Sequence, residues 1–272
     1  MEFRKHKPEP TQKGNPHGLV QRQHVFPRKA IERFYGLDRK VAVLRFGDAQ
    51  GHLRLTAEHE MFCAKRVWDQ RAESGYMAQI EKRFQRIANL VLHGDRRWLA
   101  LENDTVTIFY ALWKHRAHYG ANPVPAVLAK EVVPDNGLTK DKKERLESKH
   151  YLFIDENGMM GSRQLTGMHI QRAIDYTHIQ LRGIRWCVTQ AEPGAGEFLV
   201  PDNPQTLYVP LSPTVALLGG TDMPRADSDA VRFINLLAIA GCTRFAFARD
   251  FSLCGGARHY AELVSPPSVA MR

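Results

Sequence analysis

The sequence contains little cysteine, and it lacks the spacings in which cysteine usually binds zinc. Its 4 cysteines are scattered along the chain, and no two of them form a Cys-x-x-Cys pair. A zinc ribbon is therefore not expected, and we interpret the cysteines as reduced thiols in a cytoplasmic protein. Cys63 and Cys242 lie in apolar helical patterns, where a thiol usually packs against its neighbours.

Long apolar runs are also absent. The segment 231–240 is one of the longest, and it is far shorter than a membrane span requires. The basic opening, MEFRKHKPEP, has no apolar segment behind it, so it does not predict a secretory signal. We expect no membrane partner.

The familiar catalytic motifs are missing as well. The chain has no GxxxxGK[ST], GxGxxG, HExxH or GxSxG motif, and no His/Cys group with zinc spacing. The lack of a glycine-rich phosphate loop argues weakly against a nucleotide cofactor and against an enzyme for small anionic substrates. The sequence identifies no cofactor, and a divalent metal is one candidate.

Positive charge is abundant. The chain carries 38 Lys and Arg against 29 Asp and Glu, a net charge of +9. Such a field attracts nucleic acid, anionic lipid or acidic protein, so RNA or DNA is a candidate partner. The excess is largest in residues 1–40. Residues 1–20, rich in Pro, Gly, Lys and His, predict a disordered basic tail before a single domain over 21–272.

The hydrophobic pattern predicts an α+β fold, with a helical middle between an N-terminal β-hairpin and a C-terminal antiparallel sheet. After a short helix over 28–35, the strands 41–46 and 52–56 form the hairpin around the turn GDAQG. The remaining expected elements, in chain order, are helices at 57–68, 77–92, 105–118 and 165–181, strands at 184–189, 197–200, 206–209 and 214–218, a helix at 230–242, and a final strand at 243–248 that could return to the sheet. The mixed-charge stretch 134–149 is expected on the surface.

Two polar residues fall on apolar helix faces. Arg116 shares a face with Phe109 and Trp113, so it should meet a carboxylate or a phosphate, unless it lies at a frayed helix end and reaches solvent. Asn235 lies between Val231 and Ile239 on its helix. It either bonds a neighbouring loop carbonyl or orients a substrate.

Two further positions could carry chemistry. Asp202 and Asn203 follow a predicted strand, where carboxylates often serve catalysis or bind metal, although Asp-Asn-Pro is also an ordinary turn. The ring of His24 could transfer a proton, or it could cap the short helix that follows or simply lie on the surface. Spacing alone does not bring His24 to Asp202.

These residues lie within motifs that resemble a widespread bacterial family of uncharacterised proteins, the domain of unknown function 4238. The similar features are His24-x-x-Pro27, an arginine at the end of a central helix (Arg116), the run Asp202-Asn203-Pro204, the run Pro-Leu-Ser-Pro over 210–213, and Asn235 in the last helix. The sequence departs from the family in the spacing of Pro27 and in Val200-Pro201 before Asp202. The resemblance, from about 24 to 248, implies that His24, Arg116, Asp202, Asn203 and Asn235 share a polar site, and it implies no reaction.

Two functions from different classes fit these observations. The first is a nuclease, such as a toxin or an effector of phage defence: His24 would transfer a proton, Arg116 would contact the phosphate, and Asp202 would orient His24 or bind a divalent metal. In that reading Asn203, Asn235 and Arg28 bind or orient the substrate. The alternative is a non-catalytic module that binds nucleic acid or protein, in which the same polar residues form a structural network.

Overall fold

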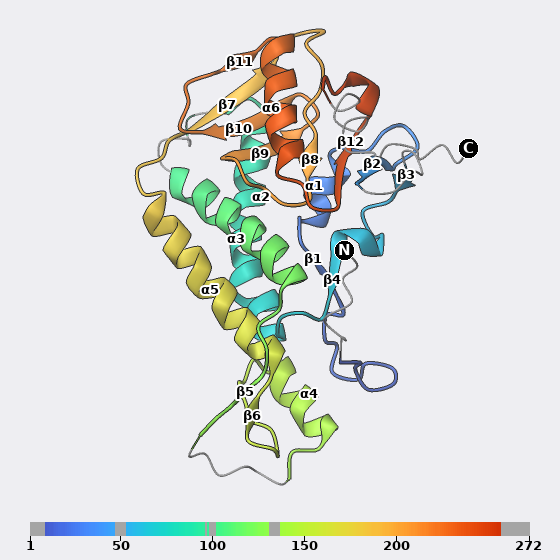
Figure 1. Ribbon diagram of the computed structural model, residues 1–272, viewed down its shortest axis with the longest axis vertical. Helices are drawn as coiled ribbons and strands as arrows, with labels where there is room; N and C mark the ends of the chain where they lie inside the picture. The colour runs from blue at the N-terminus through green and yellow to red at the C-terminus, as the bar shows by residue number, and fades with distance from the viewer. Residues whose placement is uncertain (1–8, 47–52, 96, 98–101, 131–136, 257–272) are drawn as a thin grey trace, which may run out of the picture.

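The computed structural model describes residues 9–46, 53–95, 97, 102–130 and 137–256. Within this part the chain combines long helices with several mostly antiparallel sheets, which confirms the predicted α+β class. Figure 1 shows most of the strands and α6 in the upper half, with α3, α5 and α4 descending into the lower half. The helices are α1 (Arg28–Glu32), α2 (Ala78–Leu92), α3 (Asn103–Ala121), α4 (Lys140–Ser148), α5 (Ser162–Gln180) and α6 (Ser228–Ala240).

Two four-stranded sheets build the upper half. One has the order β11 (Arg225–Ala226), β7 (Trp186–Ala191), β10 (Val215–Gly219) and β9 (Tyr208–Ser212). The other has the order β3 (Leu53–Leu55), β2 (Val41–Arg45), β12 (Phe245–Ala248) and β8 (Val200–Pro201). Because β12 pairs with both β2 and β8, the last described strand joins the N-terminal hairpin to the C-terminal part of the chain.

Shorter elements connect these sheets to the helices. A two-stranded ladder joins β1 (Arg22–His24) to β4 (Cys63–Lys65), and a second joins β5 (Val127–Leu128) to β6 (Met159–Met160). Three single turns complete the described chain: η1 (Glu60–Phe62), the π-helical η2 (Ala72–Met77) and η4 (Phe251–Leu253).

The predicted helix over 57–68 is wrong. This stretch contains η1 and then β4, whose residues pair with β1. The side chain of His59 accepts from the backbone N–H of Met61 and so caps a single 3₁₀ turn. Arg66 then adopts a left-handed conformation (φ 48°), which a helix does not tolerate. The apolar run 61–64 is thus divided between the turn η1 and the strand β4.

Two other expectations differ from the structure, and a third falls outside the described residues. Residues 9–20 are held against α4 rather than forming a free tail, because the backbone N–H of Gln12 donates to Glu144 at 2.8 Å and Leu19 is buried. Residues 1–8 and the GDAQG turn lie outside the described residues. The final strand pairs with β2 and β8, not with the sheet that contains β7, β9 and β10.

Aromatic side chains form the centre of the core. Phe84 of α2 stacks on Phe109 of α3 with ring planes 1° apart. The ring centres of Phe26 and Trp113 are 4.6 Å apart, and those of Phe26 and Phe247 of β12 are 6.1 Å apart. Helices α2 and α3 are thereby packed on the β2–β12 sheet, through side chains that bury large apolar areas.

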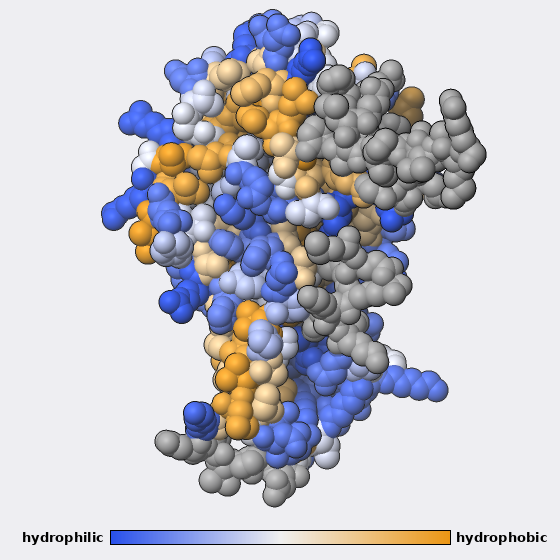
Figure 2. Space-filling model, in the orientation of Figure 1, coloured by the Kyte–Doolittle hydropathy of each residue, from blue (hydrophilic) through white to orange (hydrophobic). Residues whose placement is uncertain are grey.

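The surface is divided between apolar and polar regions. Figure 2 shows hydrophobic residues over α6 at the top, where Phe233 and Leu237 are exposed, and hydrophilic residues around α4 below. In the described part of the chain, no helix has both the length and the apolar character that crossing a membrane would require.

We predict that His115 makes the stability of this fold depend on pH. The ring of His115, on α3, lies 2.7 Å from Thr177 Oγ1 of α5, and burial lowers its pKa from 6.5 to about 4. The unfolded chain therefore binds a proton at a higher pH than the folded one, so His115 destabilises the fold as pH falls from 6.5 towards 4. Because the ring of His115 is only partly buried, the free energy of unfolding should fall by on the order of 1 kcal/mol over this interval.

The measurement is urea unfolding of the wild type and of His115→Gln between pH 7 and pH 4.5. The variant should lose less stability over this interval than the wild type. His118→Gln, an exposed histidine on the same helix, serves as the control and should follow the wild type. Parallel pH profiles for all three proteins would contradict the prediction.

Candidate functional site

Arg116 is buried in α3, and its charge is neutralised inside the protein. Its side chain is 1% exposed, and its guanidinium forms ion pairs with Glu81, through Nη1, and with Glu73, through Nη2 at 3.5 Å. Nη1 also donates to the carbonyl oxygen of His24 at 3.2 Å. Burial opposes the charge of Arg116, but Glu81 and Glu73 outweigh it and raise the pKa of Arg116. The predicted carboxylate partner is thus present, and the side chain does not reach solvent.

The carboxylate of Glu73 comes from an irregular turn. Glu73 lies in η2, where the π-helical turn is interrupted at Gly75 (φ −92°, ψ −111°). Trp68 Nε1 donates to Glu73 Oε2 at 2.6 Å, and the Trp68 ring lies 5.5 Å from the guanidinium carbon of Arg116. Burial raises the pKa of Glu73, while the charge of Arg116 acts in the opposite direction. We refer to Arg116, Glu73, Glu81, Trp68 and His24 as the Arg116 cluster.

His24 joins this cluster mainly through its backbone. It lies opposite Cys63 in the β1–β4 ladder, and its ring Nε2 is 3.0 Å from the carbonyl oxygen of Ala57. A carbonyl only accepts, so Nε2 must carry the hydrogen of this bond. The structure therefore brings His24 and Arg116 together, although the ring of His24 does not bind the guanidinium.

Asp202 lies in a different part of the fold and caps a turn. Its Oδ1 accepts from the backbone N–H of Thr243 at 2.9 Å. Its Oδ2 accepts from the Thr243 hydroxyl at 2.8 Å and from the backbone N–H of Arg244 at 3.0 Å. Burial raises the pKa of Asp202, and the bonds from Thr243 act against that shift. Both carboxylate oxygens thus hold the connection between α6 and β12.

Asn235 ties α6 to the segment before β8. Its Oδ1 accepts from the backbone N–H of Leu199 at 3.1 Å, and its Nδ2 donates to the carbonyl oxygen of Glu197 at 2.8 Å. Asn203 lies in the turn after β8, and its backbone carbonyl is close to Gly241. A Cβ built on Gly241 would lie 3.3 Å from that carbonyl oxygen. The geometry of Asn235 matches the structural alternative, a bond to a neighbouring loop.

Arg28 lies on the surface, on α1. Its side chain is 53% exposed and forms ion pairs with Glu32, at 2.8 Å, and with Glu58. Exposed pairs of this kind contribute little to stability. The geometry assigns Arg28 no contact with the other predicted site residues.

The predicted site residues therefore form two groups. His24 and Arg116 meet around α3, whereas Asp202, Asn203 and Asn235 surround the segment 197–204. Among the described residues, no hydrogen bond or ion pair joins His24 or Arg116 to Asp202. The same residues contain no group of three His, Cys, Asp or Glu side chains that could hold a metal ion.

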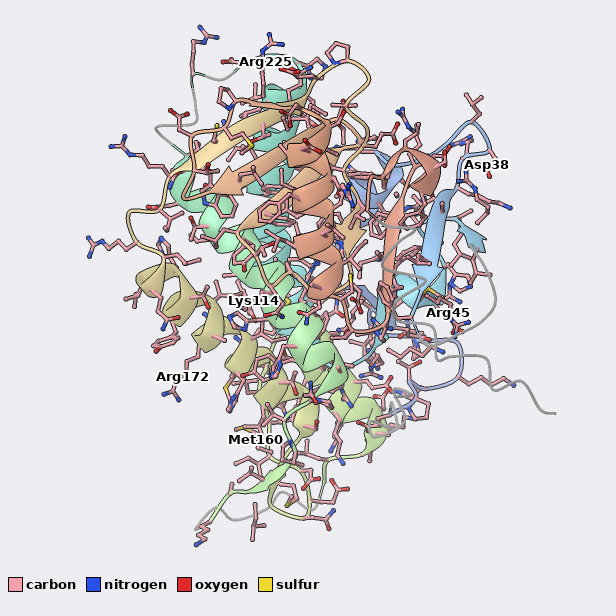
Figure 3. The ribbon with its side chains drawn as sticks, turned by 45° about the horizontal axis from the view of Figure 1, so that its top comes forward. Asp38, Arg45, Lys114, Met160, Arg172 and Arg225 are labelled. Atoms are coloured by element: carbon pink, nitrogen blue, oxygen red, sulfur yellow. The ribbon has the colours of Figure 1, made fainter. Side chains whose placement is uncertain are left out.

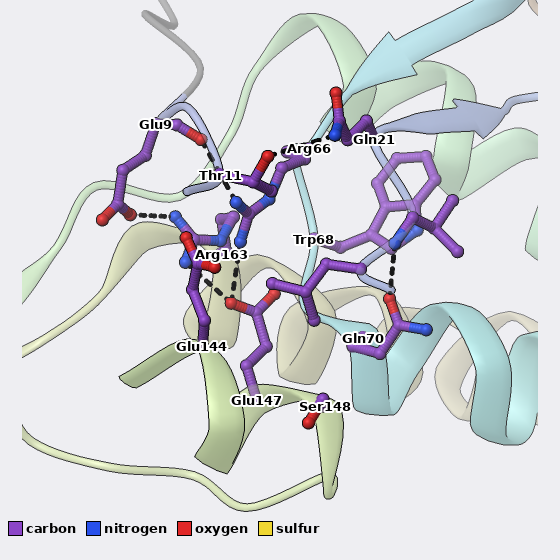
Figure 4. A network of polar contacts seen from close by, with 12 residues as sticks. Glu9, Thr11, Gln21, Arg66, Trp68, Gln70, Glu144, Glu147, Ser148 and Arg163 are labelled. Carbon is purple, nitrogen blue, oxygen red and sulfur yellow. Dashed lines mark hydrogen bonds and ion pairs between the residues drawn. The ribbon is translucent and has the colours of Figure 1, made fainter. Parts of the chain in front are cut away.

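A second buried charge network was not predicted from the sequence. Glu147 Oε2 accepts from Arg66 and from Arg163, each at 2.9 Å, and Arg163 also pairs with Glu9 (Figure 4). Glu9, Arg66 and Arg163 line a cavity of about 270 Å³ beside α4. The network fixes residues near the start of the described chain to α4 and α5. Glu147 lies in the mixed-charge stretch 134–149, and nothing in the sequence there indicates that one of its charged residues is buried.

A basic groove also escaped the sequence analysis. It has a volume of about 460 Å³ and runs along β4. We call it the β4 groove; its walls are formed by Arg45, His59, Glu60, Met61, Cys63, Ala64, Lys65, Val67, Gly120 and Arg244. Burial raises the pKa of Cys63 to about 11, so this thiol is protonated at neutral pH and is not an activated nucleophile. The basic residues of the β4 groove come from distant positions in the chain, so only the fold brings them together.

We predict that Arg116→Ala strongly destabilises the protein. The substitution leaves Glu73, and in part Glu81, without the cation that offsets their burial, which typically costs about 3–5 kcal/mol. Chemical denaturation at pH 7 measures the change. His118→Ala, on the exposed side of the same helix, is the control and should stay within about 0.5 kcal/mol of the wild type. A stable, folded Arg116→Ala protein would show that the ion pairs are not structural.

A second prediction concerns Asn235→Ala. It removes the partners of two buried backbone groups, at Glu197 and Leu199, so unfolding should become easier by about 2–4 kcal/mol. Asn203→Ala is the matched control, because no side-chain hydrogen bond of Asn203 is found in the described structure. Equal midpoints of urea unfolding for the two variants would refute the structural role of Asn235.

Comparison with protein-family models, with curated proteins and with solved structures finds no match for this chain. The resemblance to the domain of unknown function 4238 therefore stays a prediction from the sequence motifs.

Proposed function

We propose that this protein binds nucleic acid in the β4 groove, acting in the cytoplasm, and that its buried polar residues maintain the fold. The observation that carries the proposal is the convergence of three basic side chains on one open groove. Arg45 ends β2, Lys65 ends β4, and Arg244 precedes β12. A phosphate backbone is attracted to cations grouped in this way, largely without regard to base sequence.

The charges of the groove support this reading. Burial lowers the pKa of Arg244 to about 10, so its guanidinium still carries a positive charge at neutral pH. That guanidinium lies 5.1 Å from the ring centre of Phe245. Three basic side chains, Arg45, Lys65 and Arg244, line the groove beside a single carboxylate, that of Glu60, with which Lys65 pairs. Nε of Arg244 also lies 3.6 Å from Asp202 Oδ2, outside the groove lining.

Arg116 is less suited to bind phosphate than the groove residues. Its guanidinium is 1% exposed and already pairs with two carboxylates. A nucleic-acid phosphate could reach it only if these ion pairs opened, and breaking a buried pair is costly. In this proposal, therefore, the basic residues of the β4 groove contact the phosphates, and Arg116 does not.

A nuclease remains a second candidate, for one reason. His24 lies directly across the ladder from Cys63, which lines the β4 groove. With Nε2 bonded to the Ala57 carbonyl, Nδ1 keeps a lone pair that could accept a proton from a ribose hydroxyl. A metal-independent ribonuclease needs no further carboxylate cluster, so this chemistry agrees with the residues present.

Binding is tested by fluorescence anisotropy with labelled single-stranded RNA and DNA at several salt concentrations. The double variant Arg45→Gln/Lys65→Gln should bind about tenfold more weakly at low salt, and its slope of log K against log [salt] should be smaller by about 1–2. Arg172→Gln, which removes one positive charge against the two of the double variant, is the control for charge lost elsewhere, because Figure 3 places Arg172 on the side of the molecule opposite Arg45.

Two outcomes would contradict binding in the β4 groove: no binding at low salt, or equal weakening by Arg172→Gln. Cleavage is followed in the same samples, with and without EDTA, using the wild type and His24→Gln. Loss of RNA cleavage in a His24→Gln protein with an unchanged melting temperature would establish the nuclease. Intact RNA with the wild type would leave binding alone.

A further inference from the structure

A groove between α1 and α2 contains a partly buried arginine, Arg33, whose side chain bonds only neutral amides among the described residues. The groove has a volume of about 720 Å³. We call it the α1–α2 groove; its lining residues are Lys29, Glu32, Arg33, Ala78, Glu81, Lys82, Gln85, Arg86 and Asn89. Nη2 of Arg33 donates to Gln85 Oε1 at 2.5 Å and to Asn89 Oδ1 at 3.0 Å. Both partners are neutral amides.

Two donors in this groove lack acceptors. In the described structure, Nη1 of Arg33 and Nε2 of Gln85 are buried and have no hydrogen-bond partner. Leaving a buried donor unsatisfied typically costs about 1–3 kcal/mol, and more for a charged group. Burial also lowers the pKa of Arg33. Adjacent buried donors without acceptors usually indicate a missing ion, water or ligand.

The acids at the rim do not neutralise Arg33. Glu32 is bonded to Arg28 at 2.8 Å, and Glu81 is paired with Arg116. Lys29 and Lys82 are exposed on the two sides of the groove, one on α1 and the other on α2. An anion bound here would therefore meet positive charge from both helices.

We propose that the α1–α2 groove binds the phosphate group of a ligand. Phosphate oxygens accept several hydrogen bonds, and the planar fork of arginine matches their geometry. Arg33 Nη1 and Gln85 Nε2 would donate to the oxygens, after a small rotation of the side chains that cover them. Lys29 and Lys82 would contribute charge from the rim. The site is separate from the β4 groove and does not depend on nucleic-acid binding there.

The probe is inorganic phosphate, measured by calorimetry and thermal shift on the full chain at constant ionic strength, with chloride as the comparison anion. Phosphate should bind the wild type and raise its melting temperature, whereas chloride should not. Arg33→Gln should weaken phosphate binding by about tenfold, and the exposed Lys29→Gln by about threefold. Arg172→Gln is the control and should bind phosphate like the wild type.

A second arm separates the sources of the phosphate. An oligonucleotide that binds Lys29→Gln more weakly than the wild type only when it carries a 5′-phosphate would assign the site to a nucleic-acid end. Binding of free phosphate with no effect of the 5′-phosphate would assign it to a small phosphorylated molecule.

The proposal is overturned if phosphate and chloride act alike. It is also overturned if both Arg33→Gln and Lys29→Gln bind phosphate like the wild type. Lys29→Gln changes only an exposed side chain, so it keeps the test informative even if Arg33→Gln fails to fold. Loss of nucleic-acid binding in the β4-groove variant with phosphate binding intact would separate this site from the proposed function.

Discussion

A guanidinium withdrawn from water must keep carboxylates beside it, and this requirement organises the centre of the molecule. Arg116 holds the irregular turn η2 through Glu73, the start of α2 through Glu81, and β1 through the His24 carbonyl. Three segments distant in sequence thus converge on one charge. Its counter-charges extend into the α1–α2 groove, because Glu81 both pairs with Arg116 and lines that groove.

The C-terminal part uses side-chain hydrogen bonds to the backbone for a comparable purpose. Asn235 holds the backbone at Glu197 and Leu199, and Asp202 holds the backbone at Thr243. Between them these side chains fasten the segment leading into β8 to α6 at one end and to β12 at the other. Because β12 also pairs with β2, these few bonds help to join the first and last parts of the described fold.

The sequence predicted the class of the fold and most of its long helices, because each of those has a strong local pattern. It failed at 57–68, where pairing with β1 and a left-handed Arg66 outweighed helical spacing. It singled out Arg116 and Asn235 as polar residues on apolar helix faces, although for Arg116 it left open a frayed helix end that reaches solvent. It did not identify Arg33, Arg45 or Arg244, since an arginine in a polar context gives no sign of what the fold will place beside it.

Arg33 and Arg116 show why the environment, and not the residue type, separates structure from binding. Both are at least half-buried guanidiniums near α2, yet Arg116 meets two carboxylates and Arg33 meets two amides. The first charge is balanced within the chain, so an outside anion would gain little from approaching it. The second has hydrogen bonds only to amides in the described part of the chain, and it adjoins a buried donor that has no acceptor there. A ligand that brings negative charge gains most where the fold has left positive charge without it.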